Sequence, residues 1–163
     1  MRLRADEVEL PDGTVIEQYF VRESRGFVVA FAMTPDDRIV LVRQYRYGTD
    51  AMHLELPAGM LDGDEHPQDC AARELVEETG YEAASWQLVA DYYVEPVRSL
   101  AKTYVYLARD ARAVRQPNLD PGETLETELA EFDDFRTMLG DGRIDTAHSL
   151  AAAYRVLEYL GRL

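Results

Sequence analysis

The chain has 163 residues, 47% of them hydrophobic and 29% charged, which is typical of one globular domain that buries a core of its own. Acidic residues outnumber basic ones by 31 to 17, and the net charge of −14 disfavours a nucleic-acid-binding surface, because most of it would repel phosphates. A single cysteine, Cys70, excludes an internal disulfide and a zinc site built on several thiolates.

The first half of the sequence predicts β-strands followed by one helix. Segments rich in Val, Ile, Phe and Tyr are interrupted by Pro11-Asp12-Gly13 and Pro35-Asp36-Asp37, which are typical turn sequences. We expect a helix between Pro67, which suits a first helical position, and Gly80, which suits a helix end. The predicted strands are residues 14–21, 26–33 and 38–44, followed by a short segment at 53–56 and a loop at 57–63.

The second half predicts further strands and then helices. Alternating apolar residues indicate strands at 86–94 and 103–108, and a turn-rich connection at 117–123 leads to a strand near 127–132. Helices are expected at 133–139 and 146–160. Strands on both sides of a central helix, with helices after them, predict an α/β fold in which a mixed sheet packs between helices as an α/β/α sandwich.

The predicted central helix carries an acidic face. Glu74, Glu77 and Glu78 are three or four residues apart and project together, whereas Leu75 and Thr79 lie roughly opposite. Like charges at this spacing repel unless solvent or a cation relieves them. Carboxylate oxygens are ligands that Mg²⁺ prefers, so the alternatives at this point are a solvated face and a magnesium site.

The residues around this helix follow a specific spacing. From Gly59 there are five residues to Glu65, seven more to Arg73-Glu74-Leu75, one to Glu77-Glu78 and one to Gly80. This pattern is the Nudix box at every fixed position, and the chain resembles the Nudix hydrolases. The resemblance implies a Nudix-type fold in which water attacks a phosphorus of a nucleoside diphosphate linked to another group.

The resemblance also implies roles for individual residues. It implies a divalent metal, Mg²⁺ or Mn²⁺, bound by Glu74 and Glu78, with Glu77 as a third carboxylate and the Ala58 carbonyl as a backbone ligand. The resemblance therefore implies that Glu77 and Glu78 are the catalytic carboxylates. Arg73 is expected to be structural and to pair with Glu77 or Asp69.

Residues outside the box resemble one branch of the family, the ADP-ribose and nucleotide-sugar pyrophosphatases. Glu55-Leu56-Pro57-Ala58-Gly59, the segment 43–46, Pro96, and the C-terminal segment from Gly142 carry this resemblance. Arginine can hold a phosphate by two hydrogen bonds, so Arg46, and with it Arg43, are predicted substrate contacts. For Arg46 the alternative is a solvated strand end. Glu55 resembles the carboxylate that flanks the cleft in this branch.

Two features leave alternatives open. The segment 95–101 lacks the glycine and glutamate that follow a Ser-Pro turn in the branch, so GDP-mannose or a broader range of nucleoside diphosphate sugars is the alternative to ADP-ribose as substrate. The resemblance implies that a glutamate in a late loop positions the attacking water. Glu123 is the best match, and Asp120 and Glu126 are its rivals.

Partners and location follow from the same observations. The ligand is predicted to be a small nucleotide sugar, with no nucleic acid and no membrane, and the branch implies a homodimer to which the N-terminal strands in residues 1–25 contribute. No apolar run reaches the roughly 20 residues of a membrane span, and the N-terminus does not resemble a secretory signal, so we expect a cytoplasmic protein. From another class, the alternative is a sensor that binds ADP-ribose without cleaving it; the complete set of glutamates argues against this.

Overall fold

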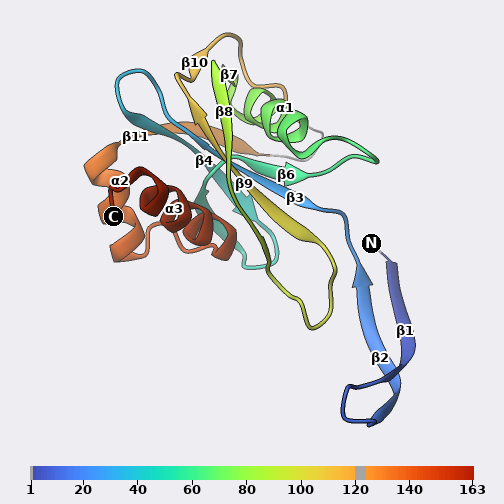
Figure 1. Cartoon of the computed structure of the whole chain (residues 1–163). Helices are drawn as coiled ribbons and strands as arrows, with labels where there is room; N and C mark the ends of the chain where they lie inside the picture. The colour runs from blue at the N-terminus through green and yellow to red at the C-terminus, as the bar shows by residue number, and fades with distance from the viewer. Residues whose placement is uncertain (1, 120–123) are drawn as a thin grey trace.

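Two β-sheets form the centre of the computed structural model, which describes residues 2–119 and 124–163 (Figure 1). The larger sheet has the order β6-β3-β9-β8, and the smaller one has the order β11-β4-β5. Strands β3 and β9 run parallel, and the other paired strands of both sheets run antiparallel, so the arrangement is mixed. In chain order the strands are β3 (Phe27–Ala32), β4 (Arg38–Arg46), β5 (Ala51–Glu55), β6 (Ala58–Met60), β8 (Ser85–Tyr93), β9 (Lys102–Arg109) and β11 (Leu125–Glu131).

Helices cover both faces of these sheets. Helix α1 (Pro67–Thr79) lies on one side, and α2 (Phe132–Asp141) and α3 (Ala147–Leu160) lie on the other (Figure 1). Helix α1 contacts β3, β4 and β6, while α3 contacts β3, β8 and β9. The predicted α/β/α sandwich with a mixed sheet is confirmed.

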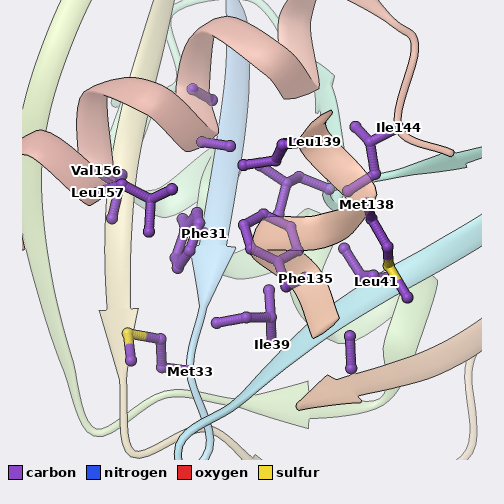
Figure 2. Close-up of a cluster of buried hydrophobic side chains, with 14 of the residues drawn as sticks. Phe31, Met33, Ile39, Leu41, Phe135, Met138, Leu139, Ile144, Val156 and Leu157 are labelled. Atoms are coloured by element: carbon purple, nitrogen blue, oxygen red, sulfur yellow. The ribbon is translucent and has the colours of Figure 1, made fainter. Parts of the chain in front are cut away.

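Strand β3 shows why its sequence is apolar without interruption. Successive side chains of a strand point to opposite faces, and here both faces are covered by helices. Phe31 belongs to the core cluster under α2 and α3, where its ring meets Phe135 edge-on with centroids 5.4 Å apart (Figure 2). The neighbouring Ala30 packs instead with Leu75 of α1. Strand β3 therefore packs against the apolar face of α1, and this packing orients the acidic face of the helix.

A two-stranded hairpin of β1 (Arg2–Glu9) and β2 (Val15–Glu23) extends away from the sandwich (Figure 1). Its exposed apolar side chains include Leu3, Val15 and Phe20. The hairpin is joined to the sandwich near its base, where the Arg22 amide donates to the Arg98 carbonyl at 2.7 Å and the Arg22 guanidinium pairs with Glu95 at 2.9 Å.

The sequence predicted most elements and missed the short or charged ones. Of the N-terminal strands that the branch implies within residues 1–25, β1 has no counterpart among the strands predicted from the residue pattern, because its alternation is carried by charged residues. Strand β6 lies within the predicted loop at 57–63, so that prediction is wrong for these three residues. The two-residue strands β7 (Tyr81–Glu82) and β10 (Arg112–Ala113) pair with each other beyond the end of α1 and were also missed. Among the helices of the described residues, none combines the length and apolar character needed to cross a membrane.

Candidate functional site

Helix α1 begins and ends with residues that suit those positions. The side chain of His66 accepts a hydrogen bond from the Gln68 amide, and Pro67 fills the first turn, where its missing amide hydrogen costs nothing. At the other end Gly80 adopts a left-handed φ of 74° and donates its amide to the Val76 carbonyl. A Cβ on Gly80 would lie 2.0 Å from the Arg115 carbonyl oxygen, so glycine is needed for space as well as for backbone conformation.

The three predicted metal-binding glutamates lie on the side of α1 that meets β6. Glu78 is buried, with 6% of its surface exposed, and its Oε2 accepts a hydrogen bond from the Ala58 amide at 3.0 Å. Glu74 is mostly buried and Glu77 is more exposed. The structure thus brings Glu74, Glu77, Glu78 and Ala58 to one place, as the sequence predicted, although their role as ligands stays a prediction.

Arg73 holds the acidic face together. Its guanidinium bonds to Glu74 and Glu77 at 2.9 Å each and to both oxygens of Glu65 at 3.0 Å. The hydrogen bonds from Arg73 lower the pKa of Glu65 to about 2. The expected ion pair of Arg73 with Glu77 is present. The other expected partner, Asp69, does not bond to Arg73; Glu65, in the loop before α1, does. Arg73 is structural in this arrangement.

Gly59 on β6 lies against the Glu74 carboxylate. A Cβ at position 59 would meet the Glu74 Cδ and Oε1 atoms at 2.0 Å each. Glycine at this point of the motif therefore keeps space for a carboxylate, which is what a cation-binding side chain requires. The donor set of carboxylate and backbone oxygens suits a hard divalent cation.

The three carboxylates line one cavity but form hydrogen bonds with different partners. Within residues 2–119 and 124–163, no group of three or more Asp, Glu, His or Cys side chains is arranged to hold a metal ion. Glu74 and Glu77 bond to Arg73 instead, and Glu78 bonds to the Ala58 amide. Mutual repulsion favours this separation.

A cavity of about 300 Å³ opens between this helix and the sheet. Its walls combine the acidic residues with polar and cationic side chains from β4 and from the segment before β3. The residues that line it include Arg25, Gln44, Arg46, Gly59, Glu74, Glu77, Glu78 and Asn118. A cavity with anionic residues on one wall and arginines on another can hold a metal–phosphate complex.

The two arginines predicted to contact substrate lie on opposite faces of β4. Arg46 lines the cavity, and Glu55, which is buried on the adjacent strand β5, accepts from both its Nε and a terminal nitrogen. Arg43 has the opposite parity along the strand, lies outside the cavity, and pairs with Glu128 of β11. Glu55 therefore positions Arg46 rather than lining this cavity itself, and the placement of Arg43 gives no support to its predicted phosphate contact.

The candidates for the catalytic base lie in or next to the connection before β11. Glu123 and its rival Asp120 lie outside the described residues. The other rival, Glu126, is exposed on β11 and does not line the cavity.

Sequence reasoning missed several residues of the cavity, among them Asn118 and Gln44. Asn118 is brought there by its amide, which donates to the Glu77 carbonyl at 2.8 Å, and no local sequence signal marks it. Gln44 is a polar residue that follows the apolar Val40 and Val42 on the same face of β4, and it is only 7% exposed. That interruption of the apolar pattern was a usable signal.

A second cavity of about 190 Å³ adjoins the first, and both are lined by Arg25, Phe27 and Met60. Its far wall is the segment 94–103, which departs from the sequence pattern of the branch. Ser99 there is buried and its hydroxyl lies 2.9 Å from that of Ser24. His148 also lines this cavity, with its ring centroid 4.5 Å from that of Phe27, and burial lowers the pKa of His148.

Comparison with known proteins identifies the family. The model of the NUDIX domain matches residues 24–153, which include α1 and nearly all of the sandwich. The chain belongs to the NUDIX family. The Nudix chain is 31% identical over 160 residues to the methanol dehydrogenase activator of Bacillus methanolicus, an alignment that covers 97% of this chain and 86% of that protein.

A second relative and a solved structure add to this comparison. The Nudix chain is 40% identical over 116 residues to the ADP-ribose pyrophosphatase of Mycobacterium tuberculosis, covering 71% of this chain and 56% of that protein. A solved structure described as an ADP compounds hydrolase superposes with a TM-score of 0.84 at 23% identity, covering 99% of this chain and 88% of that one. The relatives support hydrolysis of nucleoside diphosphate sugars, and the structural likeness shows the Nudix fold.

Proposed function

We propose that this Nudix hydrolase cleaves the pyrophosphate of ADP-ribose with water, in a reaction that depends on Mg²⁺ or Mn²⁺ and gives AMP and ribose 5-phosphate. The observation that carries the proposal is the cavity in which Glu74, Glu77 and Glu78 face Arg46 across a space large enough for a diphosphate. The name of the mycobacterial relative supports ADP-ribose as the sugar nucleotide.

The residues of the cavity have different roles in the proposed hydrolysis of the diphosphate. Glu74, Glu78, Glu77 and the Ala58 carbonyl would hold the cation. When bound, a divalent ion neutralises charge that builds on the phosphate oxygens and acidifies bound water. Arg46 donates hydrogen bonds to the phosphate, and Glu55 keeps its guanidinium pointed there. Glu123 remains our candidate for the residue that positions the attacking water.

A product panel tests this proposal. The purified protein is incubated with Mg²⁺ or Mn²⁺ and, in separate reactions, ADP-ribose, GDP-mannose and other nucleoside diphosphate sugars, and the products are separated by anion-exchange chromatography. AMP with ribose 5-phosphate supports the proposal. If GMP and mannose 1-phosphate are released faster than AMP and ribose 5-phosphate, the preferred substrate is GDP-mannose rather than ADP-ribose. Absence of turnover with every compound and both metals refutes catalysis and favours a binding protein.

Matched variants test the assigned residues. Glu78→Gln keeps the shape of a buried side chain but removes a charge, and we expect turnover to fall at least about 100-fold with weaker Mn²⁺ binding. Glu128→Gln, on the far side of β4 from the cavity, is the control and should keep near-normal turnover. Equal activity of Glu78→Gln and the wild type would remove the basis of the proposed metal site.

We also propose a homodimer formed through the N-terminal hairpin. A two-stranded hairpin is marginally stable alone, and this one exposes Leu3, Val15 and Phe20, so a second copy would bury surface that the described chain leaves open. Light scattering coupled to size-exclusion chromatography should give twice the 18.5 kDa chain mass. The double variant with Leu3→Glu and Phe20→Glu should lower the measured mass toward that of a single chain. A monomeric wild type would contradict the proposal.

A further inference from the structure

Gln44 lines the cavity, and the oxygen of its amide has no hydrogen-bond partner among the described residues. The side chain lies on β4 and lines the cavity that also contains Glu78 and Arg46. Its Oε1 atom is enclosed by protein, and among the described residues nothing bonds to it. Because Oε1 is enclosed while the residue still lines the cavity, the NH₂ end of the amide is the polar end that can face it.

A buried amide oxygen without a hydrogen-bond partner is destabilising. An enclosed polar atom that gives up water without gaining a hydrogen bond lowers the stability of the fold, so an apolar side chain is favoured at such a position. Val40 and Val42, at alternate positions on the same face of β4, are both buried and apolar. Gln44 breaks this series at the point where the strand reaches the cavity.

The chemistry of the surroundings indicates the ligand. The α1 wall of the cavity is lined with carboxylates, which attract cations, while Gln44 and Arg46 on β4 offer N–H donors and no charge that would repel an anion. An amide NH₂ directed into such a space suits a phosphate oxygen. A hydrogen bond to a charged acceptor is also stronger than one between neutral groups.

We propose that Gln44 is a substrate-binding residue whose NH₂ donates a hydrogen bond to a nonbridging oxygen of the diphosphate. The diphosphate is then held from the sheet by Gln44 and Arg46 and from α1 through the cation. The identity of the ligand as a diphosphate rests on the proposed function. The amide selects for a phosphate acceptor without adding positive charge, so it leaves the cation as the main source of charge neutralisation.

The test separates diphosphate binding from catalysis. Binding of α,β-methylene-ADP, a nucleoside diphosphate whose bridging carbon resists hydrolysis, is measured by calorimetry with Mg²⁺ for the wild type, Gln44→Met and Gln44→Glu. Gln44→Met should bind this probe about 10- to 100-fold more weakly. Gln44→Glu, which has the same shape but no donor and a negative charge, should also bind it more weakly. Gln87→Met, an exposed position on β8, is the matched control and should bind like the wild type.

Two readouts without nucleotide exclude a merely structural role. Gln44→Met should unfold at the same temperature as the wild type or higher, because it removes an unpaired polar group, and it should bind Mn²⁺ alone with unchanged affinity by electron paramagnetic resonance. The enclosed Oγ1 of Thr127 on β11 also has no described partner and lies on the same face, so a water shared with Gln44 is the competing explanation.

The outcomes distinguish this inference from the proposed function. The inference is overturned if folded Gln44→Met binds the probe with an affinity within about twofold of the wild type. If that variant also unfolds at a lower temperature, the result indicates that Gln44 binds a structural water instead. If Gln44→Met fails to fold, normal binding by Gln44→Glu overturns it. A wild type that cleaves nothing in the product panel, yet binds the probe through Gln44, refutes the proposed function and supports the inference.

Discussion

Replacing Gly59 by alanine should damage the metal site while leaving the fold intact. Gly59 lies in β6 without a left-handed φ, so its backbone can accept alanine. The new methyl group would lie 2.0 Å from the Glu74 Oε1 atom, whereas ordinary contact begins at 3.4 Å. The Glu74 carboxylate must therefore move by at least 3.4 − 2.0 = 1.4 Å.

That displacement is large compared with metal coordination. Mg²⁺ holds oxygen ligands at about 2.0–2.1 Å in a strict octahedral geometry, so a carboxylate displaced by this much no longer serves as a ligand. We expect Mn²⁺ affinity to fall roughly 10-fold or more and turnover to fall on the order of 100-fold. Glu74 ends a flexible side chain that can swing aside, so the free energy of unfolding should change by no more than about 1 kcal/mol.

The assay combines Mn²⁺ titration by electron paramagnetic resonance, turnover of ADP-ribose, and urea denaturation. Gly140→Ala is the control: Gly140 lies in α2, a Cβ there would have no neighbour within 4 Å, and alanine in a helix should stabilise by about 0.5–1 kcal/mol. The double variant Gly59→Ala with Glu74→Gln should bind Mn²⁺ no worse than Glu74→Gln alone, because both changes remove the same ligand.

Wild-type Mn²⁺ affinity in a folded Gly59→Ala protein would refute this reasoning, since it would mean that Glu74 is not needed where the structure places it. Loss of folding would refute the part of the argument that assigns Gly59 to the site rather than to stability.

Three further predictions concern stability and reactivity. Gly80→Ala should lower the free energy of unfolding by about 2 kcal/mol or more in urea denaturation, because alanine strains the left-handed φ and its Cβ meets the Arg115 carbonyl; an unchanged midpoint would contradict this. Burial lowers the pKa of His148 below its usual 6.5, so the unfolded chain takes up the proton more readily: stability should be full above about pH 6.5 and fall as the pH drops below it, and His148→Phe should flatten that slope. Burial raises the pKa of Cys70 to about 12, so its thiol should resist Ellman's reagent in the native protein and react after denaturation; rapid native reaction would show an accessible thiolate.

The helix and its acidic residues could be predicted because their signals are local. Residues three and four apart share a helical face whatever the rest of the chain does, so Glu74 and Glu78 could be assigned to one face from spacing alone. Pro67 and Gly80 likewise mark the ends of a helix by their own backbone preferences. The layered α/β architecture followed from the order of such locally determined segments.

The tertiary structure decided which distant residues meet. In the register of β4 against β5, Glu55 lies opposite Val42 and therefore on the same face as Arg46, whose guanidinium reaches it. In the register of β4 against β11, Glu128 lies diagonal to Arg43 on the other face, and the two side chains bond. Spacing in sequence carries little information about such pairings, because register depends on long-range packing and a shift by one residue reverses every side chain.

The sequence by itself therefore determined the family, the layered fold and the acidic helix, all of which depend on patterns within short segments. Only the packed sheets showed that Arg46 rather than Arg43 reaches the cavity, that the Ala58 amide bonds to Glu78, and that the amide oxygen of Gln44 has no partner among the residues that the structure describes. These facts depend on contacts between strands and a helix far apart in the chain, whose geometry is fixed when the common core excludes water.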